Sequence, residues 1–319
     1  MEDFKGKSIV VTGAGGFIGS AIVRRLVALG AVVHAVVRHG GGRVRLTEVI
    51  NDIVLHEADI TDQSAMEGIF SKSAPDGVFH LAAISQTFGS IPSVDALIDT
   101  NIRATIKLMD AVAPTTFFVN TDTFAVVGAK QVPSRESDML EPTELYGISR
   151  IPATLYGGVL GRTKGRPVTT VRVFTPYGPF VQKGKLPYEV ITRALLNTDI
   201  TLTKPEVTRD FIHTDDLVDL YLRAGARARE YPGQVFNGGG GRAVTLEEFA
   251  NLVREETQSQ SMVRWSDTAV SYDLGRSAAD LTKVRESLMW QPSVSLREGV
   301  RKTIEWFRSH QDYWSSQIL

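Results

Sequence analysis

The sequence predicts an α/β protein that contains a doubly wound parallel sheet and a smaller mixed α/β unit in its C-terminal part. Two observations carry this prediction. Apolar, β-branched runs alternate with helical patterns over about the first 175 residues, and the alternation breaks down after Tyr177. Strands joined by helices pair in parallel, because each helix crosses one face of the sheet before the next strand begins.

Six apolar runs are expected to form the strands of the sheet. They are Ser8–Val11, Ala31–Val37, Ile53–Glu57, Gly77–Leu81, Thr116–Asn120 and Val168–Phe174. The helical stretches between them begin near Gly16, Asp62, Ser93 and Glu144. This order of elements predicts helices on both faces of the sheet.

The last third of the chain is expected to form the smaller unit. The alternation is interrupted there by Pro179, Pro187, Pro205 and the glycine run at 238–241. Thr245–Glu248 and Ser295–Glu298 each match a capping box, which predicts that helices begin at these places. We therefore predict a larger domain over residues 1–176 and a smaller one over 177–319. A segment near 207–240 can return to the main sheet.

The composition excludes several classes of function. The 319 residues are 43% hydrophobic, carry a formal net charge of −1 and include no cysteine. The near-neutral charge gives no basic surface for nucleic acid, and no apolar run is long enough for a membrane helix. The charged start of the chain does not resemble a signal peptide. We expect a cytoplasmic protein without disulfides, a metal site, or nucleic-acid or membrane partners.

The most informative motif is the turn between the first strand and the first helix, Thr-Gly-Ala-Gly-Gly-Phe-Ile-Gly at residues 12–19. Gly13 allows a tight turn, Gly16 lets backbone amides approach a pyrophosphate, and Gly19 lets the helix lie close to the strand. Free N–H groups and the positive end of the helix dipole then bind the phosphates. Such a turn can also be only a turn, but the flanking strand and helix favour a dinucleotide site of the Rossmann type.

The residues after the second and third strands bear on the choice of dinucleotide. An NAD-binding chain usually ends its second strand in Asp or Glu, whereas an arginine suits the 2′-phosphate of NADP. The strand ends here in Val37-Arg38-His39, which favours NADP(H) over NAD, although arginine there is also common as surface charge. Asp59-Ile60 follows the third strand, where the carboxylate either meets an adenine amino group or caps the next helix.

A tyrosine and an arginine follow the fifth strand at a spacing that suits proton transfer. That buried strand ends in hydroxyl residues, the last of which is Thr123, and Tyr146 and Arg150 stand four residues apart. On a helix this spacing puts a cation beside a phenol. A free tyrosine titrates near 10, and we expect the cation and a low-dielectric pocket to lower that pKa. A Tyr–Arg pair on its own more often lies on the surface without a function, but its place in a dinucleotide fold favours a catalytic role.

Together these residues resemble the extended short-chain dehydrogenases/reductases, in the branch that acts on nucleotide-linked sugars. The resemblance covers nearly the whole chain and includes Thr12–Gly19, Asp59–Asp62, His80–Ala83, Asn101, Thr123, Tyr146, Phe174–Pro179, Arg209–His213, Asn237–Gly239 and the segment around Trp306. It implies that Tyr146 is the acid/base at the sugar oxygen and that Thr123 hydrogen-bonds this oxygen. It also implies that Arg150 holds the nicotinamide ribose and that Arg209 binds the diphosphate of the substrate. An exposed ion pair between Arg209 and Asp210 is the alternative.

The full set of expected site residues follows from the glycine turn and from this resemblance. Expected to bind the cofactor are Gly13, Gly16, Phe17, Ile18, Gly19, Arg38, Asp59, Ile60, Leu81, Ala82, Ala83, Thr121, Tyr146, Arg150 and Phe174. Expected to bind the substrate are Ser85, Thr123, Thr175 and Arg209. The expected catalytic residues are Thr123, Tyr146 and Arg150.

The chain departs from the family pattern at four points. Arg150 stands where the family has lysine, and Thr175 replaces the usual asparagine. Dehydratases of the family carry an Asp-Glu pair just after the active-site threonine, where this chain has Phe124 and Ala125. Reductases that also epimerise C3 and C5 use a cysteine, which is absent here. An arginine is not a conservative replacement for a lysine at such a site.

These observations predict NADPH-dependent reduction of a nucleotide-linked keto sugar. The first alternative is a 4-epimerase that keeps its NAD(P) tightly bound and returns the hydride to the opposite face. The second is a non-catalytic nucleotide-binding protein, motivated by Arg150 and Thr175. The helices at 93–113 and 144–162 resemble those that pair in family dimers, so we expect a homodimer, although packing within one subunit also explains their apolar faces.

Overall fold

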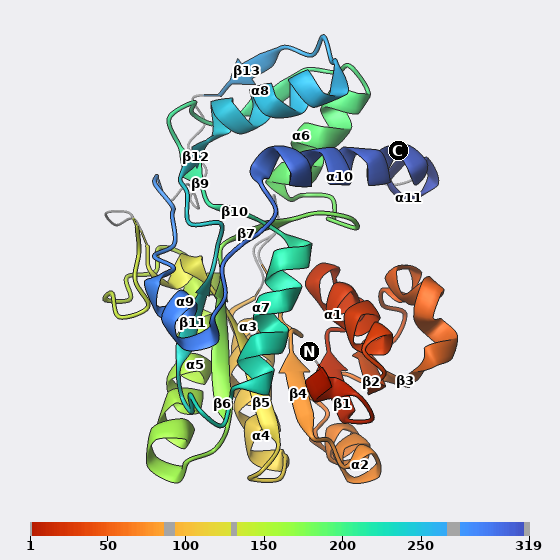
Figure 1. The fold of residues 1–319 in the computed structure, drawn as a ribbon, viewed down its shortest axis with the longest axis vertical. Coiled ribbons are helices and arrows are strands. Elements are labelled where there is room, and N and C mark those ends of the chain that lie inside the picture. The colour runs from red at the N-terminus through yellow and green to blue at the C-terminus, as the bar shows by residue number, and fades with distance from the viewer. Residues whose placement is uncertain (1, 86–92, 129–132, 267–274, 316–319) are drawn as a thin grey trace.

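The computed structural model describes residues 2–85, 93–128, 133–266 and 275–315, and its centre is a seven-stranded sheet (Figure 1). All neighbouring strands in the sheet are parallel. In spatial order they are β11 (Val235–Gly238), β6 (Val168–Val173), β5 (Phe117–Thr123), β4 (Gly77–His80), β1 (Ser8–Thr12), β2 (Val32–Val37) and β3 (Ile53–Glu57). The predicted doubly wound α/β fold is confirmed.

Helices cover both faces of this sheet, as the alternation of the sequence predicts. One face carries α1 (Phe17–Ala28), the 3₁₀ segment η2 (Arg43–Asp52) and α7 (Thr214–Ala226). The other carries α2 (Gln63–Ser73), α4 (Thr105–Ala111) and α5 (Leu145–Lys164). The helical run that leads into α4 begins with α3 (Val94–Leu97) and the π-helical turn η3 (Ile98–Ala104).

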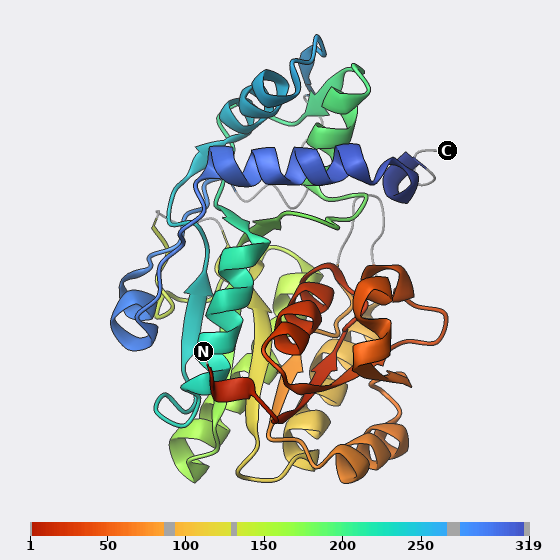
Figure 2. The same ribbon diagram turned by 45° about the vertical axis from the view of Figure 1, so that its right-hand side comes forward.

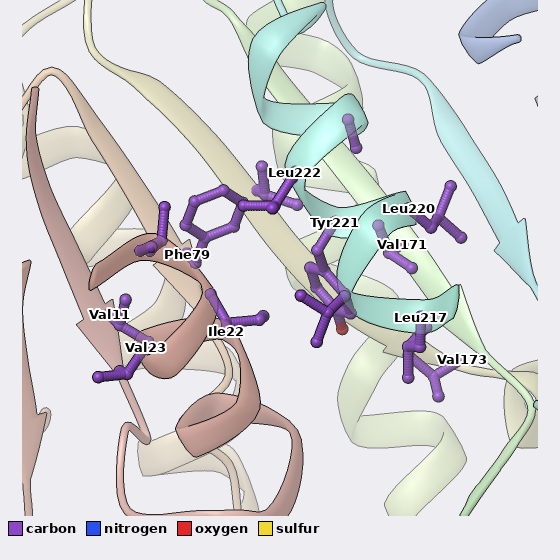
Figure 3. Packing of buried hydrophobic residues seen from close by; sticks show 14 of the residues in the cluster. Val11, Ile22, Val23, Phe79, Val171, Val173, Leu217, Leu220, Tyr221 and Leu222 are labelled. Atoms are coloured by element: carbon purple, nitrogen blue, oxygen red, sulfur yellow. The ribbon is translucent and has the colours of Figure 1, made fainter. Parts of the chain in front are cut away.

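Figure 3 shows the core between the sheet and the helices α1 and α7. Ile22 on α1 and Leu220 on α7 point toward strand residues such as Val11, Phe79 and Val171, and all five are fully buried. Burying an aliphatic or aromatic side chain of this size stabilises the fold by about 1.5–3 kcal/mol. This core fixes α1 against β1, and so fixes the glycine turn that joins them.

The fifth strand extends beyond its apolar run to Thr123, as its hydroxyl-ended pattern predicts. The apolar run suggested a strand over Thr116–Asn120, but β5 runs to Thr123 because its pairing with β6 continues as far as Thr123 opposite Val173. β-branched threonines suit a strand, and the neighbouring strand supplies hydrogen-bond partners that a single sequence does not reveal. The hydroxyl residues therefore lie within the strand.

The smaller unit lies beyond the carboxyl ends of the strands (Figures 1 and 2). It contains α6 (Leu186–Leu195), α8 (Leu246–Thr257), α10 (Leu296–Ser309) and α11 (Gln311–Ser315). Its strand pairs are β7 (Thr175–Tyr177) with β10 (Phe211–His213), β8 (Ile200–Leu202) with β13 (Val263–Trp265), and β9 (Thr208–Arg209) with β12 (Val244–Thr245). These elements enclose a separate apolar core, in which Phe211 and Phe249 stack with ring centroids 4.1 Å apart.

Both capping boxes begin helices as predicted. Thr245 accepts a hydrogen bond from the Glu248 N–H at the start of α8, and Ser295 accepts one from Glu298 at the start of α10. Before α8 the chain returns to the large sheet, where it forms α7 and β11. Between α8 and α10 it returns again, and α9 (Thr282–Leu288) packs on α7 and β11. The division at residues 176 and 177 remains a prediction. None of the helices in the described ranges is long and apolar enough to cross a membrane.

Candidate active site

The glycine turn between β1 and α1 is shaped by close backbone contacts. Gly13 has φ +68°, and a Cβ there would lie 2.7 Å from the Ala82 nitrogen. A Cβ on Gly19 would collide with the Gly13 carbonyl oxygen. Gly16 precedes the first turn of α1 and provides no side-chain cap, so the N–H groups of that turn remain available to an anion. The backbone therefore has the shape and polarity that a pyrophosphate requires.

Two adjoining cavities open from this turn, with volumes of about 760 and 320 Å³. The predicted residues that line the larger one are Gly13, Gly16, Phe17, Ile18, Gly19, Leu81, Ala83, Ser85, Thr121, Thr123, Tyr146, Arg150, Phe174, Thr175 and Arg209. Those that line the smaller one are Gly13, Gly16, Arg38, Asp59, Ile60, Leu81, Ala82 and Ala83. Every expected site residue therefore faces one cavity or both, although the residues are spread over two thirds of the chain.

The smaller cavity has cationic and anionic groups at its rim. The exposed Arg38 lines it at the end of β2. Asp59 accepts two hydrogen bonds from Thr61, at 2.9 Å from the backbone nitrogen and 2.7 Å from the hydroxyl. Burial acts to raise the pKa of Asp59, but these bonds and the charge of Arg38 outweigh it and lower the pKa. The helix cap of α2 is Asp62, so the alternative that Asp59 caps this helix is wrong.

The larger cavity contains Thr123, Tyr146 and Arg150 together. Thr123 ends β5, and its side chain is hydrogen-bonded to the Tyr146 phenol. Arg150 lies one turn further along α5, is only 1% exposed, and donates from Nη2 to the Thr121 carbonyl oxygen. Its Nε and Nη1 are buried and have no hydrogen-bond partner among the described residues. The predicted constellation forms, and the guanidinium retains donors for a ligand in the cavity.

The pKa of Tyr146 is raised above its ordinary value, whereas we expected from the sequence that it would be lowered. Burial raises the pKa of this phenol, while the charge of Arg150 lowers it, those of Asp122 and Glu144 raise it, and the hydrogen bond with Thr123 lowers it. The expectation that a low-dielectric pocket lowers this pKa was wrong, because burial disfavours the charged phenolate. The environment of Tyr146 therefore favours the protonated phenol.

An ion pair that the sequence analysis missed lies directly behind these residues. Arg172 Nε on β6 donates to Asp122 Oδ2 at 3.0 Å, and the two side chains are 2% and 1% exposed. Asp122 Oδ1 accepts from the Thr123 backbone N–H at 2.8 Å. Charged residues inside otherwise apolar strands were the available signal, since such residues are rarely buried without a partner.

Charged side chains also gather at the end of the larger cavity that faces the small unit. Glu144, Lys185 and Arg209 line it together. Burial raises the pKa of Glu144, and the charges of Arg209 and Lys185 oppose that rise. Asp210 is fully buried and accepts backbone N–H groups of Gly240, Gly241 and Ala279. The alternative of an exposed Arg209–Asp210 ion pair is therefore wrong.

The positions where family dehydratases carry an acid pair are apolar in this site. Phe124 and Ala125 line the larger cavity, and the Phe124 ring stacks on Phe174 with centroids 5.6 Å apart. Thr175 begins β7 and faces the same cavity. Neither Phe124 nor Ala125 can exchange a proton with a substrate.

A buried asparagine ties the cavity wall to the helix that carries Tyr146. Asn101 on η3 accepts from the Ile84 N–H at 2.9 Å and donates to the Ile84 carbonyl oxygen at 2.9 Å. It also donates to Ser149 Oγ on α5 at 2.9 Å. These bonds connect the segment after β4 with α5, so they fix one wall of the cavity relative to Tyr146.

The fold and this site define a dinucleotide-dependent enzyme of the extended short-chain dehydrogenase/reductase type, as the sequence resemblance implies. The chain belongs to the NAD dependent epimerase/dehydratase family, whose pattern it matches over residues 9–239. It is 30% identical to the UDP-glucose 4-epimerase of Mycolicibacterium smegmatis over 94% of this chain and 98% of that protein.

Solved structures support the same assignment. The UDP-glucose 4-epimerase of Thermotoga maritima, solved with UDP-glucose, is 29% identical and superposes with a TM-score of 0.86 over 95% of this chain and 99% of that one. DesIV of Streptomyces venezuelae, a dTDP-glucose 4,6-dehydratase with NAD and TYD bound, is 27% identical, with a TM-score of 0.87 over 97% and 99%. The chain is similar to enzymes with different reactions, so its reaction depends on its own residues.

Proposed function

We propose that this enzyme reduces the keto group of a nucleotide-linked sugar with NADPH. One observation carries the proposal: the hydrogen-bonded pair Thr123–Tyr146, with Arg150 beside it, opens on a cavity in which Phe124 and Ala125 replace the dehydratase acids. Such a site can exchange a proton with a sugar oxygen. It has no acid–base pair at those two positions with which to eliminate water.

The residues around both cavities fit a dinucleotide. The turn at Gly13–Gly19 would hold the pyrophosphate, Asp59 the adenine, and the orphaned donors of Arg150 the nicotinamide ribose. The bound cofactor supplies a hydride to the carbonyl carbon. Tyr146 then gives its proton to the carbonyl oxygen, while Thr123 holds that oxygen by a hydrogen bond.

Arg38 supports NADPH as the cofactor. It lines the smaller cavity at the end of β2, where an NAD-specific carboxylate would otherwise stand. The nearest acid of β3, Glu57, is paired with Arg43 and lies 3.5 Å from His39. A 2′-phosphate would therefore meet an arginine rather than a free carboxylate.

The substrate end of the cavity supports a nucleotide diphosphate sugar. Arg209 lines this end with Lys185, and two cations suit a diphosphate. Glu144 lies among them and offers hydrogen-bond acceptors to sugar hydroxyls. Ser85 and Thr175 line other parts of the same cavity and are proposed to contact the sugar.

Purified enzyme incubated with NADPH and nucleotide-linked 4-keto sugars tests the proposal. We expect oxidation of NADPH with formation of the reduced sugar, and slower turnover with NADH. Failure to oxidise NADPH with a panel of uridine, thymidine, cytidine and guanosine diphosphate 4-keto sugars would contradict it. Mass spectrometry of the nucleotides that co-purify would identify the base in the same preparation.

A 4-epimerase is the second candidate, and the two similar UDP-glucose 4-epimerases favour it. It would use the same residues, with Tyr146 first as base and then as acid. This candidate predicts NAD(P) that co-purifies tightly and no net consumption of added NADPH. Interconversion of UDP-glucose and UDP-galactose without added cofactor would establish it and exclude the reductase.

The exposed apolar face of α5 supports a homodimer. Ile148, Leu155 and Val159 share this face and are 50%, 54% and 47% exposed, and Val94 and Ile98 lie beside them on α3 and η3. Such an apolar patch is typical of an interface. Leu155→Glu should convert a dimer into a monomer in light scattering, whereas Val54→Glu on the edge strand should not. A wild-type monomer would contradict this assignment.

A further inference from the structure

The Arg172–Asp122 ion pair lies behind the proposed proton-transfer residues. The pairing of β5 with β6 sets Asp122 beside Arg172, and both side chains are almost completely buried. A buried ion pair is weak evidence for stability, because removing two charges from water offsets their attraction. Its location at the carboxyl end of the sheet therefore calls for another explanation.

A continuous chain of hydrogen bonds connects this pair to the phenol. Arg172 Nε donates to Asp122 Oδ2 at 3.0 Å, and Asp122 Oδ1 accepts from the Thr123 N–H at 2.8 Å. The Thr123 side chain in turn is hydrogen-bonded to Tyr146. Both carboxylate oxygens are thus engaged, and the backbone of Thr123 is held where its hydroxyl meets the phenol.

The charges around Tyr146 give Asp122 a second role. Arg150 faces the phenol from α5 and Glu144 from the N-cap of that helix, Asp122 faces it from β5, and Tyr221 faces it from α7. Arg150 favours the phenolate, whereas Asp122 and Glu144 favour the neutral phenol. Asp122 also lies within the field of Arg150, whose Nε and Nη1 have no partner among the described residues.

We propose that Asp122 is a positioning residue for the proton transfer: its carboxylate holds Thr123 against the Tyr146 phenol, and its charge balances that of Arg150 there. This inference rests on the proposed role of Tyr146. A guanidinium is permanently charged and favours the phenolate. Burial is the largest cause that keeps the phenol protonated, and the opposing carboxylate of Asp122 adds to it. Arg172 orients Asp122, and its charge favours the carboxylate against the burial that raises the pKa of this group.

Asp122→Asn separates charge from geometry, because the amide oxygen can still accept a hydrogen bond. With tyrosines labelled at ¹³Cζ and the Tyr146 signal assigned through Tyr146→Phe, NMR should show the phenol titrating about one pH unit lower than in the wild type. The basic limb of the kcat profile for reduction should move the same way, because protonated Tyr146 is the donor. KM should change little.

Asp122→Ala removes the acceptor as well as the charge. We expect kcat to fall about 10- to 100-fold below that of Asp122→Asn, since small displacements of a reacting group have effects of this size. Asp216→Asn is the matched control: this buried carboxylate accepts from Ser293 and Val294, away from Tyr146. The control should leave the titration of Tyr146 unchanged.

Two further results decide the inference. If Asp122→Asn fails to fold, the double variant Asp122→Asn/Arg172→Gln removes the uncompensated cation and should show the same downward shift. An unchanged titration of Tyr146 in the variant that folds would overturn the role of Asp122. If the phenol shifts but the wild type reduces none of the keto sugars, the proposed function fails and the role of Asp122 stands.

Discussion

The two ends of the site are built in different ways. At the glycine turn the backbone makes the site: missing Cβ atoms at Gly13 and Gly19 allow close contacts, and no side chain caps the N–H groups at the start of α1. At the junction of β5 and α5 side chains make the site, and the charges of Asp122 on β5, of Arg150 on α5 and of Glu144 at the N-cap of α5 act on Tyr146. A backbone site depends on local sequence, whereas a side-chain site depends on how distant strands and helices pack.

The largest effect is expected at the side-chain end. Tyr146→Phe removes the proton donor, and kcat should fall about 10³-fold because positioned acid–base groups contribute on this scale. The affinity for NADPH, measured by fluorescence, should stay within a few-fold. Tyr156→Phe on the same helix, whose hydroxyl contacts Asp110 near the surface, should retain activity. Equal activities of the two variants would show that Tyr146 is not the donor.

A substitution in the glycine turn should change stability and NADPH binding, whereas Tyr146→Phe changes kcat. Gly19→Ala forces a methyl group against the Gly13 carbonyl oxygen, so it should destabilise the fold by about 1–3 kcal/mol and weaken NADPH binding. Urea unfolding and a cofactor titration measure the two effects. Gly68→Ala inside α2, where a Cβ meets no atom within 4 Å, should leave cofactor binding unchanged and stabilise the fold by about 0.5–1 kcal/mol, because alanine is the better helix former. Normal cofactor affinity in Gly19→Ala would refute the backbone account.

The sequence predicted the glycine turn better than the side-chain end, because the turn depends on local sequence and the side-chain end on tertiary packing. The glycine turn, Arg38 and Asp59 lie at strand ends that periodicity locates, so their positions around the cavities could be predicted. Asp122 and Arg172 could not be paired from the sequence, because their contact depends on the register between β5 and β6. The expected lowering of the Tyr146 pKa was wrong for a different reason: the buried pocket was expected, but burial raises the pKa of a phenol.

Replacement of Arg38 tests whether the smaller cavity binds the 2′-phosphate of NADPH. A hydrogen bond to a charged group is worth about 1.5–3 kcal/mol, so Arg38→Ser should raise the KM for NADPH about 10- to 100-fold and leave that for NADH nearly unchanged. Arg25→Ser removes an exposed arginine from α1 and serves as the control. An enzyme that already prefers NADH would contradict the assignment of Arg38.

His80, beside the glycine turn, should affect stability against pH rather than activity. It is fully buried between Thr12 Oγ1 at 2.7 Å and Thr105 Oγ1 at 2.9 Å, and burial together with the charge of Arg150 lowers its pKa to about 3. Below about pH 6.5 the histidine binds a proton in the unfolded chain, but in the folded protein it stays neutral until about pH 3. The free energy of unfolding should therefore fall by about 1.4 kcal/mol per pH unit between pH 6 and 4.

The variant His80→Gln removes this titrating group. The slope of stability against pH should become shallower by the amount that His80 contributes. His310→Gln at the exposed end of α10 should leave the slope unchanged. An unaltered slope in His80→Gln would show that the histidine is not held neutral by the core.

The central claim is that Tyr146 and Arg150 serve hydride transfer to a keto sugar. The most direct measurement uses NADPH that carries deuterium at the transferred position, a nucleotide-linked 4-keto sugar and mass spectrometry of the product. The account predicts one deuterium on the sugar carbon in the wild type and almost none in Tyr146→Phe within the same time. A sugar that is epimerised without gaining deuterium, or that is unchanged by the wild type, would contradict it.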